Sequence, residues 1–327
     1  DKSTVSSAES AIDEMSGGAV IDGETFSLTT DSPKNLILTA KNDLVEAGKF
    51  LEGKIILDQG GNDVLNASLT GNLTNSTTIQ GVEQINLDWD AYSTATVNAA
   101  NISAEKGKET TITLSSSKSG FLGDATVSNT EANNVTAGAG IKGKLTVTGV
   151  TDSTINAEAA KEVVATGKAD SDAKIAIVAG ANTTDITASV YNNANIDAKN
   201  AKNISLTDID SSSTTSLKVE NDAKVALNTS AGSFDLDIAD KKTTELTGTY
   251  KELNVKGSGD VILKTTVDDK KITSKKDAGT LTIETTEITA TDIKKVQADV
   301  VKFTGIFNNT VTAKSGANIE FSNDSVT

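Results

Sequence analysis

The stretch that decides the fold is residues 185–219, which read DITASVYNNANIDAKNAKNISLTDIDSSSTTSLKV. Short segments of apolar and β-branched residues alternate there with runs of Asn, Asp, Ser and Lys, as in short strands joined by turns. The apolar centres of this and the following segments are Ile186, Ile196, Leu206, Leu217, Leu227, Leu236 and Leu246, at spacings of 10, 10, 11, 10, 9 and 10 residues. This regular spacing of about ten residues predicts a β-solenoid whose coil has either two sides and ~20 residues or three sides and ~30 residues.

We therefore expect an all-β protein with an elongated, parallel β-helix-like solenoid over residues 25–327, subdivided near 165–180. Residues 1–24 are expected to form a helical or linker segment, with a short helix at 3–15. Tandem small β-sandwich domains are the alternative, because they also place strands 8–12 residues apart. Aromatic residues make up only 3% of the chain, which favours the thin stacked layers of a solenoid over a sandwich core. The segment FDLDI at 234–238 alternates strictly, so we expect its two Asp side chains to face outward.

The composition removes most of the side chains that enzymes use. The chain has no His and no Cys, and all 30 of its basic residues are Lys. It therefore lacks the usual neutral-pH base, a thiolate nucleophile and bidentate Arg clamps. We expect that the protein is not an enzyme, and β-helix lyases and hydrolases are disfavoured for the same reason.

The charge and hydropathy patterns exclude further classes. A net charge of −15 argues against nucleic-acid binding, which needs a basic surface. No apolar run approaches the ~20 residues that span a bilayer, so we expect no transmembrane segment. The chain begins Asp1-Lys2-Ser3-Thr4, without an initiator Met or a signal sequence. We expect either a fragment of a longer protein or a chain exported by a signal that lies outside it.

A more specific pattern lies between residues 55 and 103. Residues 55–74 read IILDQGGNDVLNASLTGNLT, residues 78–87 read TIQGVEQINL, and residues 95–103 read ATVNAANIS. This succession resembles the RTX-type surface-layer (S-layer) proteins that Gram-negative bacteria of the Campylobacter and Caulobacter kind export. The resemblance implies an extracellular, structural β-solenoid at the cell surface, whose partners are copies of itself in a two-dimensional array assisted by Ca²⁺.

The same succession of motifs also occurs in large secreted adhesins. The alternative function is therefore a secreted adhesin or passenger domain that binds a glycan or a host surface. Pairs of Lys at 241–242, 270–271 and 275–276 could contact anionic lipopolysaccharide or acidic patches on neighbouring subunits, or they could form a solvated face.

The first candidate metal site is the turn that contains Asp58, Gly61, Asn62 and Asp63. GNDVL at 61–65 matches the second half of the Ca²⁺-binding nonapeptide Gly-Gly-x-Gly-x-Asp-x-apolar-x, whereas the first half is replaced by Asp58-Gln59-Gly60. Gly61 would let backbone carbonyls turn inward, and Asp63 would supply a carboxylate. Because a complete site needs a matching turn from a neighbouring coil, a Ca²⁺ site and a purely structural turn both remain open.

The second candidate site is the pair Asp88 and Asp90. In an extended segment these two carboxylates lie on one side and Trp89 lies on the other. They could bind Ca²⁺ or, with an aromatic ring nearby, contact a sugar. The alternative is an ordinary solvated strand face.

Overall fold

The computed structural model describes residues 21–90, 94–117, 123–131, 133–138, 140–169, 174–190, 192–208, 214–227, 233–248, 252–264, 271–274, 280–284, 293–296, 300–304, 311–313, 315–316 and 318–321. Strands and turns make up these residues, and none of them is helical. The helix expected at 3–15 lies outside the described residues.

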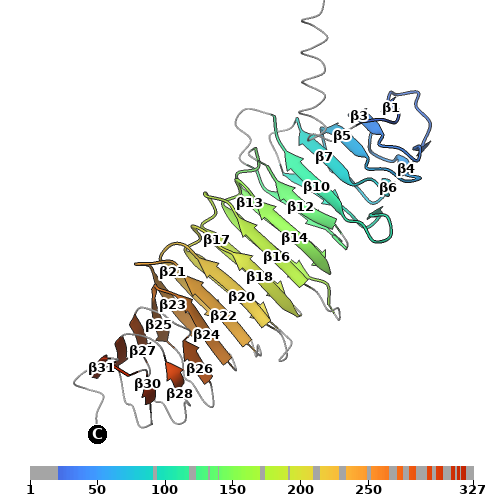
Figure 1. The fold of residues 1–327 in the computed structure, drawn as a ribbon. Helices are drawn as coiled ribbons and strands as arrows, with labels where there is room; N and C mark the ends of the chain where they lie inside the picture. Colours follow the sequence, from blue (N-terminus) through green and yellow to red (C-terminus); the bar gives the residue numbers. More distant parts are fainter. Residues whose placement is uncertain are drawn as a thin grey trace, which may run out of the picture. The chain divides into compact units, whose positions relative to one another are not determined.

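The chain forms two compact units, residues 1–155 and 156–327. In each unit short strands lie side by side in a stack of coils, as Figure 1 shows for β16, β18, β20 and β22 of the second unit. The boundaries expected from the sequence, after residue 24 and near 165–180, stay predictions.

The first unit contains three sheets, named here after their first strands. The β1 sheet consists, in order, of β1 (Thr25–Ser27), β3 (Leu44–Gly48), β5 (Val64–Leu69), β7 (Gln84–Trp89), β10 (Thr110–Ser115), β12 (Asn133–Ala137) and β14 (Asp152–Ala157), the last of which contains the unit boundary. The β2 sheet consists of β2 (Asn35–Ile37), β4 (Ile55–Leu57), β6 (Thr78–Gln80) and β9 (Ile102–Ser103). The β8 sheet consists of β8 (Ala95–Asn98), β11 (Ala125–Ser128) and β13 (Lys144–Val150).

The second unit has two long sheets and one strand pair. The β16 sheet consists of β16 (Lys174–Ala179), β18 (Asn193–Asp197), β20 (Thr214–Val219), β22 (Ser233–Ile238), β24 (Glu252–Gly257) and β26 (Lys271–Ser274). The β15 sheet consists of β15 (Glu162–Gly167), β17 (Asp185–Val190), β19 (Asn203–Asp208), β21 (Ala223–Leu227), β23 (Thr243–Gly248), β25 (Asp260–Lys264), β27 (Thr280–Glu284), β29 (Val300–Thr304) and β31 (Asn318–Phe321). The remaining pair is β28 (Ile293–Val296) with β30 (Val311–Ala313).

The strand register shows how long each coil is. Thr214 of β20 pairs with Ser233 of β22, nineteen residues later, and Ser233 pairs with Glu252 of β24 after another nineteen. Strands of the β15 sheet alternate with strands of the β16 sheet along the chain. In the second unit the ten-residue spacing therefore corresponds to half a coil, and the coil has two sides and about 20 residues. In the first unit the chain passes through all three sheets between β7 and β10, so this coil has three sides.

The core of the second unit is a set of apolar ladders that run from coil to coil. One ladder passes through Ile177, Ile196, Leu217, Leu236 and Val255, each paired with the next in register and each buried. Burial alternates along the strands. The outward Asp side chains expected in FDLDI accordingly lie on the outer face of β22.

The pairing direction decides between the two predicted architectures. All strand pairs described are parallel, whereas sandwich domains of the immunoglobulin kind are antiparallel. The β-solenoid prediction is confirmed, and the tandem-sandwich alternative is wrong.

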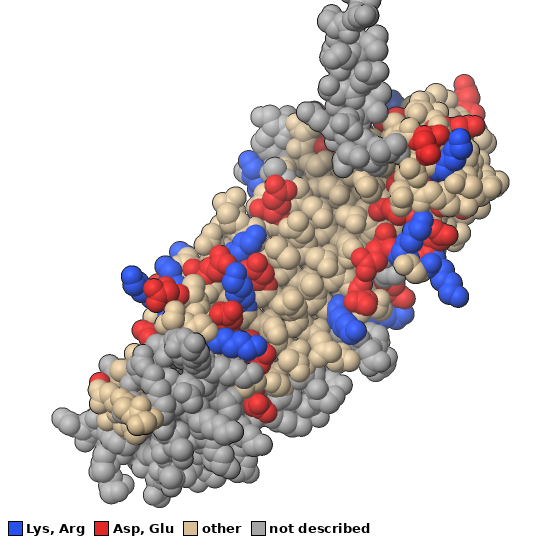
Figure 2. Space-filling model, in the orientation of Figure 1, with Lys and Arg blue, Asp and Glu red and all other residues tan. Residues whose placement is uncertain are grey.

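The outer face of β10 and β12 in the first unit is uncharged. Its outward side chains are Thr111, Thr113, Ser115, Asn134 and Thr136. Figure 2 shows a surface free of charged side chains over these strands, with acidic and basic side chains beside it. Among the described residues, no helix is long and apolar enough to cross a membrane.

The apolar ladder yields a stability prediction. Replacing Leu217, which is 1% exposed between Ile196 and Leu236, by Ala should lower the free energy of unfolding by roughly 2–5 kcal/mol, because burial is lost and a cavity forms. Urea unfolding followed by far-ultraviolet circular dichroism measures the change. The neighbouring Ser216→Ala on the outer face should change the free energy by less than about 0.5 kcal/mol. Equal effects of the two variants would contradict the ladder.

Candidate metal centre

Three stacked turns of the first unit carry the candidate residues, and they lead into β3, β5 and β7. The last residues of these turns are Asp43, Asp63 and Glu83. They are spaced by 20 residues because Leu44 pairs with Val64, and Val64 pairs with Gln84. The coil length thus brings one acidic residue per coil to the same position.

Backbone N–H groups partly satisfy these acidic side chains. The N–H of Asp43 donates to Oδ1 of Asp63 at 2.7 Å, and the N–H of Asp63 donates to Oε2 of Glu83 at 2.7 Å. Asp43 itself accepts from the N–H groups of Glu24 and Thr39, each at 2.6 Å. Each carboxylate therefore joins its own coil to the preceding coil by a charge-assisted hydrogen bond.

Asp58 is placed beside these turns by two glycines. The N–H of Gly60 donates to both carboxylate oxygens of Asp58 at 2.9 Å. Gly81, with φ of +91°, lies so close that a Cβ on it would be 2.6 Å from Cβ of Asp58. Only a glycine fits there, since any larger residue would push Asp58 aside.

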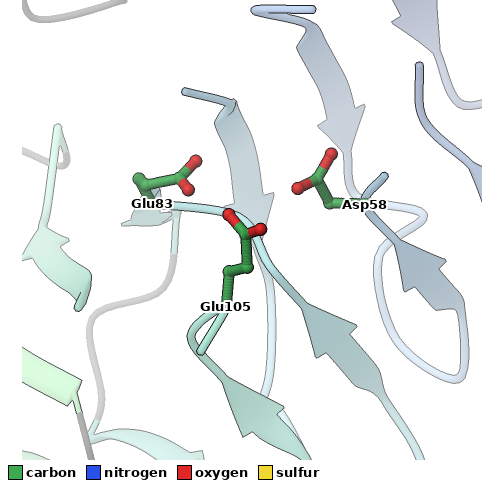
Figure 3. Close-up of side chains that lie close together, drawn as sticks. All are labelled: Asp58, Glu83 and Glu105. Atoms are coloured by element: carbon green, nitrogen blue, oxygen red, sulfur yellow. The ribbon is translucent and has the colours of Figure 1, made fainter. Parts of the chain in front are cut away.

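Three carboxylates converge from three segments of the chain. One oxygen each of Asp58, Glu83 and Glu105 lies within 4.8 Å of the other two, and Figure 3 shows the side chains pointing toward a common space. The side chain of Glu83 is 13% exposed, whereas that of Glu105 is 46% exposed. The group is therefore open to solvent on the side of Glu105.

Asp63 adds a buried carboxyl behind this group. Its residue is fully buried, and its Oδ2 has no hydrogen-bond donor. Burial and contact with the Asp58 carboxyl raise the pKa of Asp63 to about 8, although the hydrogen bond from Asp43 acts in the opposite direction. Two carboxyls in contact need either a shared proton or a cation between them.

Lys108 provides a cation from within the chain. Its Nζ donates to the carbonyl oxygen of Gly61 at 2.7 Å, and it lies 3.0 Å from Oε1 of Glu83 and 2.7 Å from Oε2 of Glu105. The contacts with Glu105 and Glu83 raise the pKa of Lys108. Its ammonium group is therefore charged at neutral pH.

The chemistry of this acidic cluster, defined as Asp58, Asp63, Glu83 and Glu105, fits a hard divalent cation. All of its donors are oxygens, which suit Ca²⁺ and Mg²⁺ better than softer metals. Ca²⁺–oxygen distances are about 2.3–2.6 Å, so the oxygens of Asp58, Glu83 and Glu105, which lie within 4.8 Å of one another, can surround a single ion. The acidic cluster could thus hold a metal.

The other two residues of the first candidate site have different roles. Gly61 supplies the carbonyl oxygen that Lys108 contacts, and a Cβ on Gly61 would lie 2.3 Å from the carbonyl oxygen of Lys41. Asn62 is exposed, and its N–H donates to Oδ1 of Asn42 in the preceding coil at 2.9 Å. Among the four residues predicted in this turn, Asp58 and Asp63 are therefore the ones whose side chains belong to the acidic cluster.

Asp88 and Asp90 lie at the opposite end of β7 from Glu83, so the structure does not bring them into the acidic cluster. Asp88 faces outward and accepts hydrogen bonds from the hydroxyls of Ser115 and Ser117 and from the N–H of Ser117. It also lines a shallow hollow of about 260 Å³ on the outer face of the β1 sheet. Trp89 is buried on the inner face, and Asp90 is exposed just beyond the strand. A metal or sugar site at this pair stays a prediction.

The sequence did not single out Glu83, Glu105 and Lys108 as site residues. A signal for Glu83 was present, because acidic residues recur at intervals of 20 in NDLV (42–45), NDVL (62–65) and VEQI (82–85). The matching turn of the neighbouring coil, which the Ca²⁺ motif requires, is therefore residues 81–83. Glu105 and Lys108 lie in a loop whose path no local pattern predicts.

The lysine pairs are only partly described. Lys241 is exposed and Lys242 is half-buried. Lys270, Lys275 and Lys276 lie outside the described residues, as does the side chain of Lys271. Contact of these lysines with lipopolysaccharide stays a prediction.

Comparison with known proteins identifies no relative. No protein-family model, no curated protein sequence and no solved structure matches the chain. Because no relative matches the chain, support for a function comes from the β-solenoid fold and from the geometry of the acidic cluster.

The pKa of Asp63 gives a pH prediction. Because this pKa is raised from 3.8 to about 8 in the folded protein, the folded state holds an extra proton between these values. The stability that this proton provides is complete below pH ~4 and is lost as the pH rises through ~8. Asp63→Asn keeps an acceptor for the N–H of Asp43 and gains a donor toward Asp58. Its thermal midpoint should therefore exceed that of the unchanged chain by several degrees near pH 8.5 and by less near pH 5.

The measurement is differential scanning calorimetry in buffers that contain a chelator. Asp31→Asn, an exposed carboxylate in the same unit, is the control and should shift the midpoint little at either pH. A midpoint difference for Asp63→Asn that is the same at both pH values would contradict the shared proton.

Proposed function

We propose that this protein is a structural, non-enzymatic component of a bacterial surface layer, built as a β-solenoid that assembles into a two-dimensional array with the help of Ca²⁺. The β-solenoid is common in secreted and surface proteins. The chain also contains no His, Cys or Arg, and its motifs at 55–103 resemble those of RTX-type surface-layer proteins.

The acidic cluster is the observation that carries this proposal. Two of its members lie in stacked turns: Asp63 in GNDVL, which matches half of the Ca²⁺-binding nonapeptide, and Glu83 in the equivalent turn of the next coil. In a site of this kind, successive coils share one ion between their turns. The buried Oδ2 of Asp63 has no donor and needs either a proton or a cation, so it supports a bound ion beside this turn.

Electrostatics supplies a reason for Ca²⁺ in assembly. Copies that each carry a net charge of −15 repel one another at low ionic strength. Divalent cations at the acidic cluster reduce this charge and stiffen the turns that hold it. Uncharged outer faces such as that of β10 and β12 then provide surfaces on which copies can meet without burying charges.

The Ca²⁺ site is tested by calorimetric titration of the chelator-treated chain. The unchanged protein should bind Ca²⁺, and the double variant Asp58→Asn/Glu83→Gln should bind it at least about tenfold more weakly, because two carboxylate ligands are lost. Asp31→Asn removes one exposed charge of the same unit and is the matched control, which should bind like the unchanged chain. Equal affinities for all three proteins would place any Ca²⁺ elsewhere.

The array is tested by electron microscopy of the purified chain with and without millimolar Ca²⁺. We expect ordered sheets with Ca²⁺ and their dispersal when a chelator is added, because chelation restores repulsion between acidic copies. Particles that stay monomeric under both conditions would contradict the array and favour the secreted-adhesin alternative.

A further inference from the structure

The position of Lys108 inside the acidic cluster points to how the site is regulated. Its Nζ contacts three oxygens: the carbonyl oxygen of Gly61, Oε1 of Glu83 and Oε2 of Glu105, at 2.7 to 3.0 Å. Two of these oxygens belong to the carboxylates that converge in Figure 3, and the third belongs to the Ca²⁺-motif turn. The ammonium group thus occupies the place where a bound cation would be coordinated.

A bound divalent ion and the ammonium group of Lys108 compete for the same ligands. Oε2 of Glu83 already accepts the N–H of Asp63, so Oε1, which Lys108 contacts, is the oxygen that remains for an ion. An ion bound to Glu83 and Glu105 would also lie within a few Å of Nζ, where two positive charges repel strongly. Occupation by one cation therefore disfavours the other.

The loop that carries Lys108 is suited to such an exchange. Lys108 and Glu105 belong to one exposed turn between β9 and β10, closed by a hydrogen bond from the N–H of Lys108 to the carbonyl oxygen of Glu105 at 2.9 Å. The Lys108 side chain is 37% exposed. It can therefore move into solvent without crossing packed side chains or disturbing the strands.

We propose that Lys108 is an internal competitor of the divalent cation: it compensates part of the negative charge of the acidic cluster in the metal-free protein and is displaced when Ca²⁺ binds. This inference rests on the proposed Ca²⁺ function. Asp63 provides an independent reason for a second cation, because its buried Oδ2 has no donor and is not among the atoms that Lys108 contacts. Lys108 thus pairs with Glu83 and Glu105 and leaves Oδ2 of Asp63 without a donor.

The first test compares Ca²⁺ affinities by calorimetric titration of full-length chains. Lys108→Met keeps the length and apolar stem of the side chain but removes its charge, so Ca²⁺ should bind about tenfold more tightly than to the unchanged protein. Lys106→Met removes an exposed charge from the same loop and is the matched control, with an expected change of less than about twofold.

The outcomes separate this inference from the proposed function. Tighter binding by Lys108→Met, or binding by that variant alone, supports the competitor. Equal or weaker binding by Lys108→Met overturns the competitor while leaving the Ca²⁺ site intact. No binding by any of the three chains overturns both.

The second test uses the unchanged protein and does not depend on how a variant folds. An amine-selective acetylating ester labels lysines, and mass spectrometry gives the rate at each position. Lys108 should be labelled several-fold faster with Ca²⁺ than with a chelator, because the ion frees its amine from three oxygen contacts. The rate at Lys106 should stay the same. If saturating Ca²⁺ did not raise the labelling rate of Lys108, the proposed displacement of Lys108 by Ca²⁺ would be overturned.

Discussion

Parallel, in-register stacking of short strands is the constraint on which the rest of this structure depends. A strand of two to seven residues cannot form a stable layer alone, so each coil buries its edges and its inner face against its neighbours. The ladder through Ile196, Leu217 and Leu236 shows how aliphatic side chains suffice where aromatic residues are scarce. Because coils lie only about 4.8 Å apart, each position on a turn meets its equivalent in the next coil.

The same stacking creates the electrostatic problem from which the candidate site arises. Asp43, Asp63 and Glu83 recur at one position of three successive coils, where like charges at this spacing repel. The structure compensates them in several ways. Backbone N–H groups donate to all three, and Lys108 pairs with Glu83. Asp63 is left with one oxygen that needs either a proton or a cation.

Such a stack suits a protein whose role is mechanical. It presents the outer faces of many strands, and the proposed structural role would need no reactive side chain. An internal lysine would let the acidic turns form before the ion is present, and exchange with Ca²⁺ would then couple ion binding to the charge of the assembling surface. In the proposed arrangement, a metal at this site would regulate association and would not create the fold.

The amino-acid sequence by itself determined the strand rhythm, the two or three sides of the coil, the alternation in FDLDI and the acidic turn at Asp58 and Asp63, because these depend on local periodicity and turn chemistry. The tertiary structure alone decided that the coils of the second unit have two sides, that the coil from β7 to β10 in the first unit has three, and that Glu83, Glu105 and Lys108 join this turn. Coil lengths differ: Asn66 and Asn86 pair twenty residues apart, whereas Thr96 and Thr126 pair thirty apart. Because the loops between strands differ in length, no fixed repeat interval in the sequence predicts which residues stack on one another. Only the path of the folded backbone shows which charged side chains lie close together.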